Sequence, residues 1–277
     1  MQPQDWVRLR CVVGAEEADL VVDIFWQQGT AGVEQLGAGE AVEFIAGFDS
    51  RDGAEEARRQ LHHLGIVVEL EEVQDDGLDA WREHAEAVHA DPFWIVPAWL
   101  SAPAEADPAK VLLVEPGRTF GSGSHPTTRL VTQMLARYVR SGDRVLDVGT
   151  GSGVLALAAS RLGASSVTAI DIDEASPEVV RVNARANGAT NIAASNLSLD
   201  AIASDQTDGA FDVVAANLLA PTIEELAAGL RSVVRTHGTL IVSGLLEERW
   251  VHGVKPLEPL QPIEVVTADG WAAVALR

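Results

Sequence analysis

The first 72 residues combine two hydrophobic periodicities, which predict a small domain of strands and helices. From Trp6 to Val13 apolar and polar residues alternate, as in a half-buried strand, whereas Glu16 to Gln28 repeats apolar side chains at helical spacing and stops before Gly29. The expected elements, in chain order, are a strand over 6–13, a helix over 16–28, strands over 32–36 and 41–48, a helix over 53–64 and a strand over 66–70. This β-α-β-β-α-β order predicts a ferredoxin-like α+β domain over residues 1–72. The fold by itself predicts no chemistry.

An acidic segment follows, and it predicts a linker over residues 73–92. Its hydrophobic positions favour a short amphipathic helix around Leu78 to His89, which ends before Asp91-Pro92. We therefore expect the second domain to occupy residues 93–277.

Strands and helices alternate along the second domain, and its strands are apolar runs, as in a parallel sheet covered on both faces. The seven expected strands are 145–148, 167–172, 191–194, 211–216, 238–243, 263–267 and 271–276. Only Ala268-Asp-Gly270 separates the last two, which predicts an antiparallel hairpin at the end of the sheet. The pattern predicts an α/β domain with a seven-stranded Rossmann-like sheet.

A glycine-rich turn joins the first of these strands to a helix. Gly149-Thr-Gly-Ser-Gly153 follows a buried strand and precedes Val154 to Leu162, so backbone amides and the helix dipole converge on one point. Gly149 and Gly151 are therefore candidate cofactor-binding residues. The third glycine of a dinucleotide fingerprint would stand at position 154, where this chain has valine, so the spacing favours S-adenosylmethionine over NAD. A tight structural turn is the alternative interpretation.

The second expected strand ends in Asp171-Ile-Asp173, 22 residues beyond Gly149. An acidic side chain at that distance can accept hydrogen bonds from both ribose hydroxyls, so Asp171 is a candidate cofactor ligand. Asp173 has a structural alternative at the start of the next helix, for which Ser176 before Pro177 is the expected cap.

A second glycine-rich segment, Phe120-Gly-Ser-Gly-Ser-His-Pro-Thr-Thr128, precedes another expected helix. Pro126 suits the first helical position, and the threonine hydroxyls of the first turn suit a carboxylate such as the one at the methionine end of S-adenosylmethionine. The segment is thus expected to close over the cofactor, with Phe120 and Gly121 as candidate contacts. His125 could act as a general base, but a role in capping or orienting the turn is favoured.

Asn217 stands at the carboxyl end of the fourth expected strand, where ligands bind in such sheets. It is the candidate catalytic residue, because it can face the transferred methyl group and orient an attacking amine. The alternative is an asparagine that closes a turn before Pro221.

These motifs together resemble the ribosomal protein L-eleven methyltransferases (PrmA type). The segment from Phe120 to Thr128 is similar to that family's F-G-T-G-T-H-P-T-T signature, with two serines in place of threonines. Further matching segments, in the family's order, are Asp147-Val-Gly-Thr-Gly-Ser-Gly153, Asp171-Ile-Asp173, Asn217-Leu-Leu-Ala220, Ser243-Gly-Leu-Leu246, Trp271, Trp81 and Trp94-Ile-Val-Pro-Ala-Trp99. The similarity covers the chain from about residue 78 to its end, while residues 1–72 match mainly in layout.

The resemblance implies a class I methyltransferase that moves methyl groups from S-adenosylmethionine to lysine side chains and the α-amino group of a ribosomal protein. It also implies that the small first domain recognises the substrate and that a flexible linker repositions it. By motif position, the resemblance places Thr128, Gly149, Asp171 and Asn217 against the cofactor.

The charge of the chain is uneven and acidic. The net charge is −21, and residues 1–100 carry 21 acidic side chains against 6 arginines, a net charge of −15. Such a surface repels phosphate backbones, so direct nucleic-acid binding is not expected. The excess is either a solubility surface or a docking surface for a basic ribosomal protein.

Composition narrows the class further. Cys11 is the single cysteine, which excludes an internal disulfide and a multi-cysteine zinc site, and no metal is expected. The sequence has no signal segment and no apolar run long enough to span a membrane, so we expect a cytoplasmic protein without a membrane partner.

Three other functions stay open. A small-molecule methyltransferase would need no acidic docking domain, and a non-enzymatic binding protein would not need Asp171 or the Phe120 segment. An NAD-dependent dehydrogenase is disfavoured by Val154.

Overall fold

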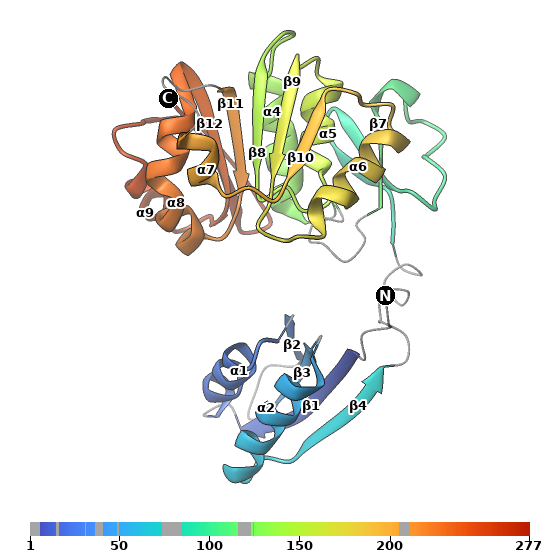
Figure 1. Cartoon of the computed structure of the whole chain (residues 1–277), viewed down its shortest axis with the longest axis vertical. Helices are drawn as coiled ribbons and strands as arrows, with labels where there is room; N and C mark the ends of the chain where they lie inside the picture. The colour runs from blue at the N-terminus through green and yellow to red at the C-terminus, as the bar shows by residue number, and fades with distance from the viewer. Residues whose placement is uncertain are drawn as a thin grey trace. The chain divides into compact units, whose positions relative to one another are not determined.

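The computed structural model describes residues 6–14, 17–30, 32–36, 41–48, 50–73, 85–115, 123, 125–204 and 211–277. The chain divides into two compact units, Met1–Ala85 and Glu86–Arg277, drawn in Figure 1. The boundary between them falls inside the segment that the sequence predicts as a linker. Each unit has a hydrophobic core of its own.

The first unit is one antiparallel sheet with two helices. Its elements are β1 (Trp6–Gly14), α1 (Ala18–Gln27), β2 (Gly32–Leu36), β3 (Ala41–Phe48), α2 (Arg51–His63) and β4 (Val68–Val73). The strands lie in the order β2-β3-β1-β4, and each neighbouring pair is antiparallel. The elements follow one another in the order that the periodicities predict.

Alternation along the strands explains how this sheet packs. Leu9, Phe44 and Phe48 are buried in one core with Phe25 of α1 and Leu61 of α2. The rings of Phe25 and Phe48 meet edge to face with their centroids 6.1 Å apart. The helices therefore cover one face of the sheet, since only the alternate apolar residues of its strands can pack against them.

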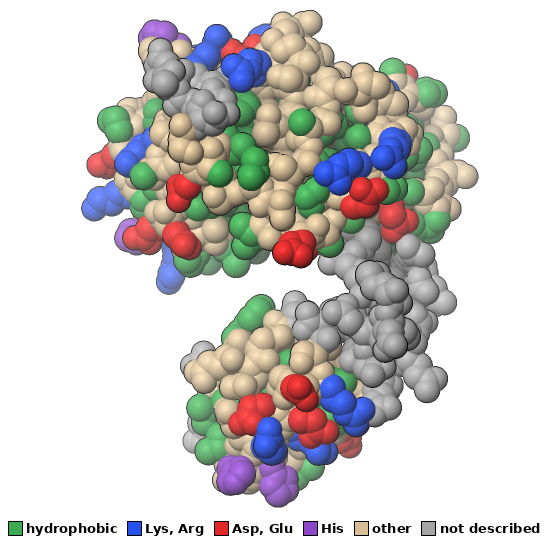
Figure 2. Space-filling model, in the orientation of Figure 1, with side chains coloured by type: hydrophobic (Ala, Val, Ile, Leu, Met, Phe, Trp, Pro, Cys, Tyr) green, Lys and Arg blue, Asp and Glu red, His purple; other side chains and the backbone are tan. Residues whose placement is uncertain are grey.

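Charged side chains occupy several of the other positions of these strands. Arg8 pairs with Glu71 across β1 and β4, and Arg10 pairs with Glu43 across β1 and β3. Figure 2 shows acidic and basic side chains together on the viewed face of this unit. Such exposed pairs add little stability, so the apolar core holds the unit together.

A three-stranded sheet opens the second unit, with β5 (Val88–Ala90), β6 (Phe93–Pro97) and β7 (Val111–Val114) in that order. The prediction of a helix that ends at His89 is wrong at residues 88–90, which form a strand. Residues 74–84 lie outside the described part of the chain. β5 pairs antiparallel with β6, and Ala90 packs in the core with Phe93. Tertiary pairing thus overrides the helical pattern.

The large sheet of the second unit has seven strands. They are β8 (Arg144–Val148), β9 (Ser166–Ile170), β10 (Ile192–Ser195), β11 (Phe211–Asn217), β12 (Val234–Leu246), β13 (Pro262–Ala268) and β14 (Trp271–Leu276). Their order is β10-β9-β8-β11-β12-β14-β13. β14 is antiparallel to both of its neighbours and lies between β12 and β13, so the predicted hairpin inserts its second strand into the sheet.

Helices cover both faces of this sheet (Figure 1). α4 (Pro126–Tyr138), α5 (Val154–Arg161) and α6 (Ser176–Ala186) contribute to the core on one face. α7 (Leu199–Ser204), α8 (Ala220–Val233) and α9 (Trp250–Val254) contribute to the core on the other. Two short 3-10 turns, η1 (Pro108–Lys110) and η2 (Lys255–Leu257), complete the unit.

Neighbouring residues of each strand face opposite cores. Val145 of β8 belongs to the first core, and Leu146 belongs to the second. This is why the central strands are continuous apolar runs in the sequence. In the described part of the chain, no helix is long and apolar enough to cross a membrane.

Candidate functional site

A cavity of about 680 Å³ lies at the carboxyl ends of the central parallel strands. The residues that line it directly after or at the ends of strands are Val148, Gly149, Ile170, Asp171, Asn217 and Leu218. From β8 the chain passes to β9 and β10 on one side of the sheet, whereas β11 and the later strands lie on the other side of β8. Ligands of such sheets bind where the strand order reverses, and this volume suits one small molecule.

The glycine turn forms the centre of this cavity. Gly149 and Gly151 have φ angles of +71° and +51°, in the left-handed region that favours glycine. A Cβ on Gly149 would lie 2.4 Å from Cδ2 of Leu218. The turn is held against β9 because the amides of Gly149 and Thr150 both donate to the carbonyl oxygen of Ile170. Both glycines predicted as cofactor ligands therefore line the cavity.

Asp171 lines the cavity beside the glycine turn. Its Oδ2 accepts a hydrogen bond from the amide of Gly151 at 2.7 Å, and its Oδ1 accepts one from the amide of Asp173 at 3.0 Å. These two contacts fix the orientation of the carboxylate, and each oxygen keeps a lone pair for a ligand hydroxyl. The structure thus brings together the turn and the acidic residue that the sequence singles out.

Asp173 serves the helix that follows. Its Oδ1 accepts a hydrogen bond from the amide of Ala175 at 2.8 Å, although the residue is exposed and also lines the cavity. The prediction that Ser176 caps this helix is wrong, because Ala175 is the N-cap and Ser176 is the first helical residue. The Ser176 hydroxyl is buried without a hydrogen-bond partner.

His125 is the N-cap of α4, and Pro126 takes the first helical position, as the sequence predicts. The Nδ1 of His125 accepts a hydrogen bond from the amide of Thr127 at 3.3 Å and lies 2.8 Å from the Thr127 hydroxyl. Burial lowers the pKa of His125, and the charge of Arg129 lowers it further. The Nδ1 atom is engaged with Thr127 at the start of α4, and this contact favours the capping role over the base.

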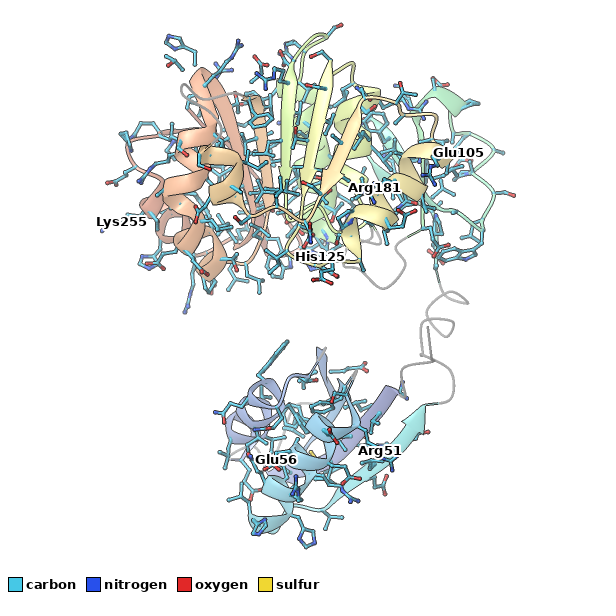
Figure 3. The ribbon with its side chains drawn as sticks, viewed as in Figure 1. Arg51, Glu56, Glu105, His125, Arg181 and Lys255 are labelled. Atoms are coloured by element: carbon cyan, nitrogen blue, oxygen red, sulfur yellow. The ribbon has the colours of Figure 1, made fainter. Side chains whose placement is uncertain are left out.

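The ring of His125 also contacts Trp271, with centroids 5.0 Å apart and an edge-to-face geometry. Both side chains line the cavity, and Figure 3 shows His125 below the ends of the central strands of the large sheet. Trp271 begins β14, which lies two strands beyond β11. The cavity therefore extends from the glycine turn, past Asn217 at the end of β11, to a wall formed by the rings of His125 and Trp271.

The two threonines after His125 take different positions. Both are buried, but Thr127 lines the cavity and Thr128 is not part of its wall. The carbonyl oxygen of Thr128 accepts a hydrogen bond from the Thr132 hydroxyl. Phe120 and Gly121, also predicted to touch the cofactor, lie outside the described residues.

Asn217 is the last residue of β11 and lines the cavity. It pairs with Ser243 of β12, and the next amide, of Leu218, donates to the carbonyl oxygen of Ser243. Because the backbone is held on β12 up to this point, the position of the Asn217 side chain is set by the sheet. α8 begins only at Ala220, so Asn217 lies before the turn into that helix.

Two asparagines that no motif of the sequence singled out support the site, one on α6 and one at its C-cap. Asn183 is buried; its Nδ2 donates to the carbonyl oxygens of Glu115 and Ser152, and its Oδ1 accepts from the amide of Glu115, each at 2.8 Å. Asn187, one helical turn later, makes the same two-way contact with the backbone of Leu113. The signal in the sequence is a pair of poor helix formers four residues apart.

Asp147 is a second buried polar residue that the sequence analysis did not assign. Its Oδ2 accepts hydrogen bonds from the Thr150 hydroxyl at 2.7 Å and the Ala156 amide at 3.1 Å, while its Oδ1 is buried without a partner. Burial raises the pKa of this carboxyl to about 7, with a further contribution from the charge of Asp171.

Potential metal ligands do not gather in the described part of the chain. Within the described ranges, no group of three or more His, Cys, Asp or Glu side chains is placed to hold a metal ion. Cys11 is buried in the first unit, and burial raises the pKa of its thiol to about 11.

The mixed sheet and the glycine turn beside an acidic strand end define an α/β methyltransferase. A family model described as ribosomal protein L11 methyltransferase (PrmA) matches residues 39–277. The chain therefore belongs to the ribosomal protein L11 methyltransferase (PrmA) family.

Individual relatives agree with this assignment. The chain is 39% identical to the ribosomal protein L11 methyltransferase of Sorangium cellulosum, over 94% of this chain and 92% of the relative. It is 34% identical to that of Myxococcus xanthus, over 89% and 88% of the two chains. The crystal structure of ribosomal protein L11 methylase from Lactobacillus delbrueckii subsp. bulgaricus superimposes with a TM-score of 0.63 at 32% identity, covering 70% of this chain and 98% of that one.

Proposed function

We propose that this protein transfers methyl groups from S-adenosylmethionine to lysine side-chain and N-terminal amines of a large-subunit ribosomal protein. One observation carries the proposal: the glycine turn, the Asp171 carboxylate and Asn217 line one cavity, in a chain of this family. We also assign the second unit to the Rossmann-like class I methyltransferases and the first unit to the ferredoxin-like folds. Their strand orders support both assignments.

The residues present fit the methyl donor. Asp171 is oriented to accept the ribose hydroxyls, and the backbone of Gly149 and Gly151 leaves room for the rest of the nucleoside. Thr127, in the first turn of α4, suits the donor's carboxylate because helix N-termini favour anions. A contact between Thr128 and the donor, as the sequence predicts, would have to be made by the Thr128 backbone or would require the segment before Thr128 to move.

S-adenosylmethionine supplies a methyl group on a cationic sulfur. The chain must present a neutral amine to it, although a lysine amine is protonated in water. Deprotonation at pH 7 costs about 4.6 kcal/mol, because the solution pKa is near 10.4. The cavity lowers this cost, since its largely apolar wall, with Leu218, Leu219 and Leu226, disfavours a charged amine.

Asn217 then orients the amine. Its side-chain amide oxygen can accept a hydrogen bond from an N–H of the amine at the end of β11, where the backbone is held by β12. His125 is occupied in capping α4, so the proton leaves to water rather than to that ring. Positioning of this kind can contribute roughly 7–11 kcal/mol to catalysis in well-oriented cases.

The acidic first part of the chain docks the substrate in this proposal. Residues 1–100 carry a net charge of −15, whereas residues 101–277 carry 20 acidic and 14 basic side chains. Complementary charge raises association rates and disfavours wrong partners. A basic ribosomal protein is therefore the partner whose chemistry fits this unit.

A methyltransferase that acts on another protein or on a small molecule is the alternative. The apolar cavity alone would accept either class of substrate, and the acidic first unit favours the protein substrate. The two functions differ in the molecule that receives the methyl group.

The test is incubation of the full chain with labelled S-adenosylmethionine and an unmethylated ribosomal protein mixture. We expect label in one large-subunit protein, on lysine side chains and the N-terminal amine, identified by mass spectrometry. Label confined to small molecules or to other proteins would contradict the proposed substrate. A chain with Asp171→Ala is the matched control and should transfer little label.

A further inference from the structure

Asp147 lies directly beneath the glycine turn of the cavity. The residue is 1% exposed, and it is the last but one residue of β8, two positions before Gly149. Its Oδ2 accepts two hydrogen bonds, from Thr150 within the turn and from Ala156 in α5. Its Oδ1 has no partner. An ionised carboxylate with one unsolvated oxygen is costly, so this site holds a proton more readily than an ordinary aspartate.

The negative charge of Asp171 acts on the buried Asp147 carboxyl. Asp171 lines the cavity, and its negative charge raises the pKa of Asp147, which stands at about 7. Two carboxylates thus hold opposite sides of one turn, Asp147 through Thr150 and Asp171 through Gly151. If a negative charge at the cavity wall acts on Asp147, a positive charge bound beside it must act with the opposite sign.

We propose that Asp147 lets the site distinguish the cationic methyl donor from the neutral thioether that remains after transfer. Asp147 releases its proton to solvent when the sulfonium donor binds, and it takes a proton back once the methyl group has left. The inference rests on the proposed function. It makes Asp147 a specificity-determining residue that acts through the turn and does not touch the substrate.

The surroundings of Asp147 contain few other groups that could produce this effect. Its strand partners are Ala169 in β9 and Ala215 in β11, which carry no charge. On the side of α4, burial lowers the pKa of His125 and so disfavours a charge on its ring, and Arg129 pairs with Asp269.

The remaining helices of that face add no buried charge. Among the described residues, α5 contributes apolar side chains from Val154 to Ala159. The charged residues of α6, Glu178, Arg181 and Arg185, pair with one another at the surface. Asp171 is therefore the charged group that acts on Asp147 in the structure.

The sign of the linkage follows from the proton count. The empty protein holds more protons at Asp147 than the donor complex does, so donor affinity rises as pH increases toward about 7 and levels off above it. A one-unit drop in the pKa of Asp147 on binding corresponds to a tenfold rise in affinity. S-adenosylhomocysteine has the same amino and carboxyl groups without the sulfonium, so the ratio of the two affinities isolates the effect of the charge.

The experiment is calorimetric titration of the full chain with S-adenosylmethionine and with S-adenosylhomocysteine, between pH 6 and 8. Each titration is repeated in two buffers of different ionisation enthalpy, which measures the protons released. We expect proton release with the donor, less with the thioether, and an affinity ratio that changes by up to about tenfold across this range. Asp147→Asn should abolish the difference in proton release and make the ratio independent of pH.

A second variant keeps the test informative if Asp147→Asn does not fold. Thr150→Val removes one hydrogen bond to the ionised Oδ2, so the rise in donor affinity should shift to higher pH. Equal proton release for the two ligands, or release that persists in Asp147→Asn, would overturn the inference alone. Failure of the wild-type chain to bind either ligand would overturn the proposed function as well.

Discussion

The Oδ2 of Asp171 accepts a hydrogen bond from the backbone amide of Gly151 at 2.7 Å. The two residues stand 20 positions apart in the chain and meet because β8 and β9 are parallel neighbours, with Val148 opposite Ile170. The contact ties the glycine turn to the acidic strand end and aims the carboxylate along the cavity wall. It is the junction on which the proposed donor site depends.

Replacing Asp171 by alanine should weaken S-adenosylmethionine binding by more than tenfold. The variant loses the acceptor for the ribose hydroxyls and releases the Gly151 amide from the contact that orders the turn. Calorimetric titration gives the dissociation constant, and thermal unfolding checks that the variant is folded. Glu174→Ala, at a nearby exposed position, is the control and should bind as the wild type does. Unchanged affinity in Asp171→Ala would remove the residue from the site.

Asn217→Ala should lower kcat by roughly a hundredfold and leave donor binding nearly unchanged. The side chain faces the cavity from the end of β11, and loss of one oriented polar group at a reacting centre has an effect of this size. Steady-state methyl transfer gives kcat, and calorimetry gives donor affinity. A variant with wild-type kcat would support the structural alternative, in which Asn217 only closes the turn before α8.

Asn183→Ala should destabilise the second unit by about 3 kcal/mol. The substitution leaves the Glu115 amide and the carbonyl oxygens of Glu115 and Ser152 without their buried partner. Urea unfolding measures the change in the free energy of unfolding. Glu178→Ala on the exposed side of the same helix should change it by less than about 0.5 kcal/mol. Equal stability of the two variants would show that the Asn183 contacts are dispensable.

The stability of the protein should depend on Asp147 with a definite sign. The pKa of this carboxyl is raised from 3.8 to about 7 on folding, so the folded state binds the extra proton, and stability falls as pH rises between these values. From pH 5 to pH 8, Asp147→Asn should gain about 3 kcal/mol relative to the wild type, at 1.36 kcal/mol per pH unit up to pH 7. Urea unfolding at both pH values measures this. A constant difference between the two proteins would show that Asp147 is ionised throughout.

Removing the first unit, residues 1–85, should abolish transfer to the ribosomal protein while donor binding persists. The second unit has its own two cores and contains every described residue that lines the cavity. Filter assays with labelled donor measure transfer, and calorimetry measures binding. Full transfer by the truncated chain would refute docking by the acidic unit.

Local patterns in the sequence were sufficient for most of the elements and for much of the candidate site. The alternation in β3, the apolar run of β8 and the glycines at 149 and 151 each constrain the backbone where they stand, so these elements and the turn could be predicted. Pro126 after His125 likewise predicts the start of α4, because proline suits a first helical turn. Asp171 could be placed by its distance from the turn.

Contacts between distant residues were decided by the tertiary structure alone. Residues 88–90 form a strand because β6 lies beside them, and β14 inserts between β12 and β13 because pairing partners are chosen in space. Asn183 binds the backbone of Glu115, 68 residues away, which no local pattern reveals. The sequence by itself determined the backbone turns and indicated the acidic residue of the proposed donor site. The burial that raises the pKa of Asp147 and the placement of Thr127 rather than Thr128 at the cavity exist only once the chain has folded.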